Sequence, residues 1–178
     1  MVPSPVDPVK LFVGVLAAPQ APIEGARSSL IRRFGPIDLE SAPIPFSFTD
    51  YYEKEMGAPL QRLFWSFERL IPPESIAEIK LATNEIEQSL ALDGRRTVNL
   101  DPGYLDTYKV ILATAKGAGQ KIHLRDGIWA DLAVTFVKGR VKFFDWGFPD
   151  YKSGRYDKTL LAIRARYKSQ RRVIVLHS

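Results

Sequence analysis

The apolar run Lys10-Leu11-Phe12-Val13-Gly14-Val15-Leu16-Ala17 constrains the fold more than any other stretch of this chain. Apolar side chains fill both alternating sets of positions, so both faces of a strand formed here have to be covered. The run therefore predicts a central strand with a packed layer on each side of its sheet. A chain of 178 residues can supply such layers, because a domain of this length buries roughly 70% of its unfolded surface.

Residue periodicity predicts the remaining elements. Apolar residues at helical spacing predict helices over 23–34, 73–91 and 153–169. Strands are expected over the ranges 37–47, 60–71, 97–100, 109–115, 120–124, 128–137 and 140–146. Lys138-Gly139 predicts a two-residue hairpin turn between the last two strands. Val173–Leu176 is expected to form a late edge strand or an exposed apolar tail.

The order strand-helix-strand-strand-helix-strand runs through residue 100, and an antiparallel hairpin and a helix follow it. This order favours an α+β fold with a mixed or antiparallel sheet and about three helices, whose first half is a candidate ferredoxin-like unit. The alternative is a doubly wound α/β sheet. We expect a single domain over residues 1–178, with a flexible Pro-rich start at 1–8 and a basic, apolar tail at 170–178.

The composition limits the chemistry and the compartment. The sequence contains no cysteine, which excludes disulfides, thiolate metal sites and cysteine nucleophiles and fits a reducing cytoplasm. It contains no apolar run of membrane-spanning length, and its first residues lack the pattern of a signal peptide. We therefore expect a cytoplasmic protein without a membrane span.

The formal net charge of +5 is concentrated near the C-terminus. Residues 151–178 hold eight Lys and Arg residues against a single Asp. A solvated helix face that ends in a basic tail explains this excess, because cations are stabilised near helix C-termini. Contacts with the phosphates of a nucleic acid are the alternative.

Several familiar catalytic motifs are missing. The Gly-containing run Lys116–Lys121 lacks the spacing of a phosphate loop, and no Ser or Thr follows Lys121 to hold magnesium. His123 and His177 are the only histidines, which is too few for a histidine-rich metal site. The sequence therefore identifies no cofactor.

Carboxylates near the expected strand ends are the better candidates for a site. We predict that Asp101 and Asp150 approach within about 10 Å of each other, close enough to share a substrate or a metal ion, and that Lys116 lies nearby. These three are the candidate catalytic residues. The candidate ligand-binding residues are Tyr104, His123, Arg125, Asp145, Trp146 and Tyr151.

Ordinary turn chemistry competes with this hypothesis. Asp101-Pro102-Gly103 is also typical of a tight turn, and Pro149-Asp150 is typical of the start of a helix. Asp131 lies inside an alternating strand and has to be either solvated or paired. The sequence does not identify a metal for this candidate site.

Five segments resemble a bacterial and archaeal family classified as a domain of unknown function, number 4416, over about residues 8–168. They are 49–57, 79–87, 96–104, 112–116 and the end of the hairpin at Trp146 and 149–151. Some members of that family carry a GTP-binding label, but this chain offers no phosphate loop for it. The resemblance implies no catalytic residues.

Three classes of function follow from these residues. The first is a small-molecule or phosphate-ester enzyme or binding protein, with Asp, Tyr and Lys in a pocket. The second is an RNA-binding module that stacks bases on Phe143, Trp146 and Tyr151 and contacts phosphates with the C-terminal cations. The third is a partner-binding protein that adds the strand Val173–Leu176 to another sheet. We rank them in this order.

Overall fold

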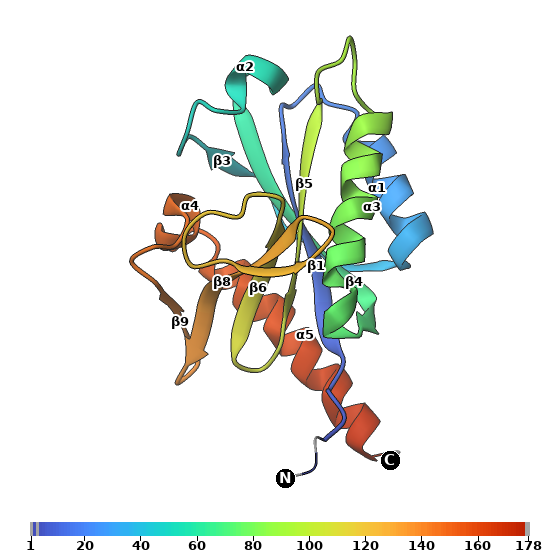
Figure 1. The fold of residues 1–178 in the computed structure, drawn as a ribbon, viewed down its shortest axis with the longest axis vertical. Helices are drawn as coiled ribbons and strands as arrows, with labels where there is room; N and C mark the ends of the chain where they lie inside the picture. Colours follow the sequence, from blue (N-terminus) through green and yellow to red (C-terminus); the bar gives the residue numbers. More distant parts are fainter. Residues whose placement is uncertain (1, 3, 177–178) are drawn as a thin grey trace.

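The computed structural model describes residue 2 and residues 4–176. Residues 1 and 3 of the Pro-rich start, and residues 177–178 of the expected tail with His177, lie outside the described residues. A twisted antiparallel sheet runs through the molecule, with α1 and α3 on one face and α5 on the other (Figure 1). No helix in the described part of the chain is long and apolar enough to cross a membrane.

The strands are β1 (Val9–Ala17), β2 (Ile37–Glu40), β3 (Ile44–Phe46), β4 (Leu60–Ile71), β5 (Val98–Leu105), β6 (Lys109–Thr114), β7 (Ile122–Arg125), β8 (Ile128–Val137) and β9 (Arg140–Phe143). The helices are α1 (Ile23–Phe34), α2 (Glu53–Met56), α3 (Ile76–Ser89), α4 (Pro149–Lys152) and α5 (Asp157–Leu176), and the 3-10 turn η1 (Pro73–Ser75) precedes α3.

The sheet confirms the α+β class and excludes the doubly wound alternative. Its strand order is β2-β4-β1-β5-β6-β8-β7, with β3 paired to β4 and β9 paired to β8. Every pairing within the described part of the chain is antiparallel, whereas a doubly wound sheet is mostly parallel. The three longer helices agree with the prediction, and α2 and α4 add a single turn each.

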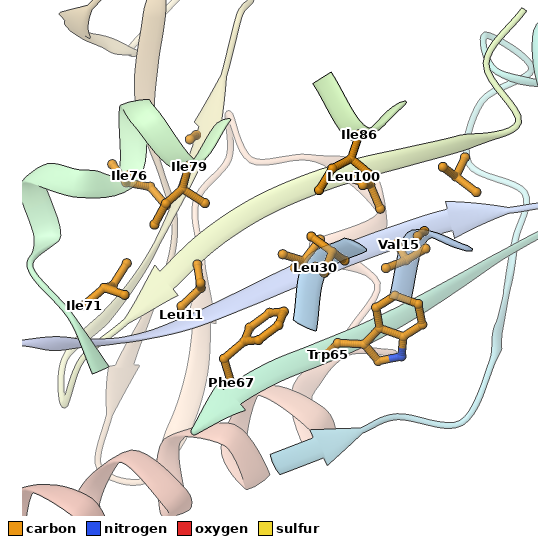
Figure 2. Close-up of a cluster of buried hydrophobic side chains, with 14 of the residues drawn as sticks. Leu11, Val15, Leu30, Trp65, Phe67, Ile71, Ile76, Ile79, Ile86 and Leu100 are labelled. Atoms are coloured by element: carbon orange, nitrogen blue, oxygen red, sulfur yellow. The ribbon is translucent and has the colours of Figure 1, made fainter. Parts of the chain in front are cut away.

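The strand β1 is central, as its apolar run predicts. Leu11 and Val15 face α1 and α3, where they join a core that also contains Leu30, Ile79 and Leu100 (Figure 2). The intervening side chains point to the opposite face. There Phe12 packs with Tyr156, which directly precedes α5, and with Leu160, Ile163 and Tyr167 of α5, which continue its helical spacing.

The hairpin between β8 and β9 turns where it was predicted. Lys138 and Gly139 have φ of 49° and 77°, the left-handed pair that a type I′ turn requires. The strand β9 ends at Phe143, three residues earlier than expected, because the chain turns at Phe144, whose carbonyl accepts a hydrogen bond from the amide of Gly147 at 2.9 Å.

The last helix is longer than expected. The helix α5 continues through Leu176, so the edge strand expected at Val173–Leu176 is wrong. The alternative, an exposed apolar tail, is helical here, and its first residue, Val173, is 57% exposed. Good helix formers dominate α5 as a whole, and no Gly or Pro interrupts the chain after Gly154, so the helix extends through the β-branched residues of its last turn. The third class of function therefore loses the strand on which it depended.

Asp101-Pro102-Gly103 is not a turn after a strand, which corrects a second prediction. The three residues lie in the middle of β5 and are paired with β1. A Cβ on Gly103 would lie only 2.7 Å from the carbonyl oxygen of Ile111 and 2.8 Å from the ring of Phe12, so close packing, rather than a turn, requires this glycine. Asp101 is thereby fixed by a rigid strand.

Candidate functional site

A cavity of about 490 Å³ opens where β5 and β6 part. The two strands pair only from Gly103 to Leu105. Beyond that point Pro102 has no backbone N–H to donate to a neighbouring strand. Asn99 and Asp101 of β5 line one side of the cavity, and residues 112–116 line the other. The segment 46–52, helix α3 and the start of α4 complete the lining.

Arg62 of β4 reaches this cavity by crossing the central strand. Its Cα is paired with that of Leu16 on β1, and its Nη1 donates a hydrogen bond of 3.0 Å to Oδ2 of Asp101, which stands on the far side of β1. The path crosses Gly14, where a Cβ would lie 3.2 Å from Nη1. The missing side chain at Gly14 therefore leaves room for this cation beside the cavity.

Asp101 is the carboxylate that the cavity exposes. Its Oδ2 accepts from Arg62 and, at 2.7 Å, from the amide of Asn99, while the ammonium of Lys80 lies 3.7 Å from its Oδ1. Its side chain is 31% exposed. Burial alone would raise its pKa, but Lys80 and Arg62 outweigh that effect and lower the pKa below its ordinary value. Asp101 is thus an ionised acceptor at neutral pH.

Lys80 and Glu87 of α3 also line the cavity. We call the charged side of the lining, formed by Arg62, Lys80, Glu87, Arg96 and Asp101, the floor of the cavity. The ammonium of Lys80 donates to the carbonyl of Leu100 at 2.8 Å and lies 4.0 Å from Oε1 of Glu87. The same Oε1 accepts from the amide of Leu100 at 2.6 Å. Burial raises the pKa of Glu87, and Lys80 opposes that rise. Both side chains are less than a tenth exposed, so their charges stabilise each other within the protein.

Arg96 holds the segment above the cavity. It donates to Glu55 through Nε at 3.0 Å and through Nη2 at 2.7 Å, a bidentate pair that ties helix α2 to the cavity rim. Its Nη1 donates to Oδ1 of Asn99 at 3.0 Å. Burial raises the pKa of the neighbouring Tyr52 to about 12, and the charge of Asp101 acts in the same direction. The phenol of Tyr52 is therefore protonated at neutral pH.

Asp150 of α4 also approaches the guanidinium of Arg62. Its Oδ2 lies 3.9 Å from Nη2 of Arg62 and accepts a hydrogen bond of 3.2 Å from the hydroxyl of Tyr156. The carboxyl is almost fully buried, and this burial raises its pKa, although Arg62 opposes the rise. Arg62 thus stands between Asp101 and Asp150, and the two carboxylates lie on either side of one cation.

Two further lysines, Lys116 and Lys121, line the cavity, and we call their side of it the mouth. The ammonium of Lys116 lies 4.2 Å from the ring centroid of Tyr51, and that of Lys121 lies 5.6 Å from the ring centroid of Phe148. Neither forms an ion pair with a carboxylate of the described residues. Both rings also line the cavity.

The structure gathers four of the nine candidate residues. Asp101, Asp150, Lys116 and Tyr151 line this cavity. Tyr151 is buried against Phe64 and Tyr156, so it cannot stack an RNA base as one hypothesis required.

The other five candidates do not line it. Tyr104 lines a different cavity, beside Tyr167. The His123 ring lies edge-on to Trp129, and Arg125 pairs with Glu78 at 3.5 Å on the surface. The two remaining candidates, Asp145 and Trp146, lie in the exposed loop after β9, and the Trp146 ring stacks on Phe144.

Sequence reasoning overlooked most of the charged lining. Arg62 was hidden inside an apolar strand, and Arg96 in a loop. One signal was available on α3, where Lys80, Asn84 and Glu87 follow each other at helical spacing beside the apolar stripe. Asp131, which had to be solvated or paired, is buried and accepts a hydrogen bond of 3.0 Å from Gln120.

The cavity combines paired charges with a mostly apolar lining. The described residues contain no cluster of three or more His, Cys, Asp or Glu side chains that could hold a metal ion. The acids are instead matched to cations, and the mouth carries an excess of positive charge. A buried charge network beside an apolar cavity is typical of a small-molecule site.

The chain belongs to the family described as Domain of unknown function (DUF4416), whose model matches residues 7–167. This confirms the resemblance noted in the sequence. No curated protein and no solved structure matches the chain. Each of the five segments that carry the resemblance contributes residues to the cavity lining.

Proposed function

We propose that this protein binds a small anionic molecule, a phosphate ester, in the cavity between β5 and β6. The observation that carries the proposal is the difference between the cations of the floor and those of the mouth. Arg62, Lys80 and Arg96 each have carboxylate partners within 4.0 Å. Lys116 and Lys121 have none among the described residues.

The unmatched lysines favour an anion at the mouth. Two ammonium groups without a carboxylate partner attract a group of opposite charge, and a phosphate monoester carries about −1.5 to −2 at neutral pH. The aromatic lining supports contact with the body of the ligand, and a volume of about 490 Å³ lies within the usual range of about 300–1,000 Å³ for small-molecule sites.

Calorimetric titration with paired compounds tests this proposal. We expect phenyl phosphate to bind at least ten-fold more tightly than phenol, and the double variant Lys116→Ala, Lys121→Ala to lose most of this difference. The matched control is Lys158→Ala, Lys168→Ala, which removes two exposed lysines of α5 that do not line the cavity. Equal affinity for the two compounds, or an equal loss in the control, contradicts the proposal.

We also infer a ferredoxin-like unit at residues 9–105. The order β2-β4-β1-β5, with α1 and α3 on one face, supports this inference. Superposition of these residues on a ferredoxin-like domain tests it, and unmatched helix positions would exclude it.

A further inference from the structure

The floor of the cavity holds a hydrogen-bond acceptor that the described residues leave unused. Oδ2 of Asp101 accepts two hydrogen bonds, from Arg62 and Asn99. Oδ1 accepts none from the part of the chain that the structure describes, and the ammonium of Lys80 lies 3.7 Å from it. The side chain is 31% exposed and lines the cavity, so a ligand there can reach this carboxylate.

Donors lie beside this acceptor. Asn84 follows Lys80 by four residues on α3, so both side chains lie on the same face of the helix, and both line the cavity. The side-chain amide of Asn84 forms no hydrogen bond with another described residue. An amide both donates and accepts, and an ammonium donates. The floor therefore combines donors with an ionised acceptor.

We infer that the ligand is a sugar phosphate, or a similar phosphorylated polyol, whose hydroxyl groups are bound by Asp101 and Asn84. The inference rests on the proposed function, which places the phosphate at Lys116 and Lys121. A hydroxyl group donates one hydrogen bond and accepts others, so it satisfies the carboxylate oxygen and the neighbouring donors together. A second phosphate at the floor would instead meet the negative charge of Asp101.

The aromatic lining argues in the same direction. The rings of Tyr51 and Tyr52 meet at 88°, those of Phe46 and Tyr52 at 70°, and those of Phe46 and Phe48 at 65°. None of these pairs forms a parallel slot for a flat ring. They offer ring faces and edges that can pack against the C–H groups of a sugar ring.

Titration with ribose 5-phosphate, glucose 6-phosphate and phenyl phosphate tests the inference. We expect at least one of the two sugar phosphates to bind ten-fold or more tightly than phenyl phosphate, which has no alcohol hydroxyl group. We expect Asn84→Ala to reduce this preference at least three-fold without weakening phenyl phosphate. Gln88→Ala, an exposed amide one turn further along α3, is the matched control.

Asp101→Asn supplies a second readout, because it keeps the shape of the side chain and removes its charge. We expect it to weaken the sugar phosphates and leave phenyl phosphate unchanged or tighter. If phenyl phosphate binds as tightly as both sugar phosphates, or if Asn84→Ala affects all three equally, the inference is overturned while the proposed phosphate site stands. If no phosphate ester binds, both fail.

Discussion

Two buried cations lie at opposite ends of the same sheet face, and they differ in what surrounds their partners. Lys10, at the start of β1, is fully buried and bonds to Asp38 of β2 and, at 2.8 Å, to Gln170 of α5. Arg62, beside the end of β1, is nearly as buried but bonds to Asp101, which is 31% exposed to the cavity.

This difference indicates that Lys10 stabilises the fold, whereas Arg62 also positions a residue of the candidate site. Asp38, the ionic partner of Lys10, is only 13% exposed and accepts a hydrogen bond of 2.6 Å from the hydroxyl of Ser66. Burial lowers the pKa of Lys10, although Asp38 opposes that effect. Arg62 instead fixes a carboxylate that lines the cavity and whose second oxygen accepts no hydrogen bond from the described residues. Burying a cation costs free energy in both places, but only the second arrangement leaves a group free to contact a ligand.

The largest effect is expected at Arg62. The change Arg62→Met removes the cation between Asp101 and Asp150 and leaves two carboxylates with less compensation, so we expect a loss of about 3–5 kcal/mol in the free energy of unfolding. Urea titration measures it. Arg27→Met, which breaks the exposed pair with Glu40, is the control and is expected to cost less than about 1 kcal/mol. Equal losses would remove the distinction between the two arginines.

A smaller effect is expected at Lys10. In Lys10→Met the carboxylate of Asp38 keeps its hydrogen bond from Ser66 and is 13% exposed, so we expect a loss of about 1–3 kcal/mol. Since Lys10 does not line the cavity, the affinity for phenyl phosphate should stay within two-fold of the unmodified protein. A large fall in affinity measured by calorimetry would show that the two ends of the sheet are coupled.

The smallest effect concerns the pH dependence of stability. The pKa of Asp101 in the folded protein lies below its ordinary value of 3.8, so its ionisation stabilises the fold above that pH, and this contribution is lost as the pH falls through the folded pKa. We expect the difference in unfolding free energy between the unmodified protein and Asp101→Asn to be constant above about pH 5 and to shrink below pH 3.8. Urea titrations from pH 3 to pH 7 measure it. A difference that grows on acidification would contradict the assigned direction.

Local patterns predicted most of the fold. The two-sided apolar run of β1, the stripe of α3 and the Lys138-Gly139 turn all rest on interactions within a few residues. The errors arose where distant contacts decide. Asp101-Pro102-Gly103 carries a turn signal, yet pairing with β1 and the close approach of Ile111 keep it extended.

The candidate site followed the same division. The sequence indicated Asp101, Asp150 and Lys116, because carboxylates and lysines among Pro, Gly and aromatic residues stand out locally. It did not indicate Arg62, which lies 39 residues from Asp101 in the sequence and reaches it across a glycine of a third segment. Such a contact depends on strand order, which no local pattern contains.

The sequence by itself determined the family, the α+β class and the elements of the central sheet, because each depends on residue type and short-range periodicity. The tertiary structure alone decided which charges meet. It placed β1 between β4 and β5, so that Gly14 lies between Arg62 and Asp101. It also parted β5 from β6 at Pro102, which opened a cavity beside those charges. Both outcomes depend on side chains that are distant in the chain and adjacent only after the sheet has formed.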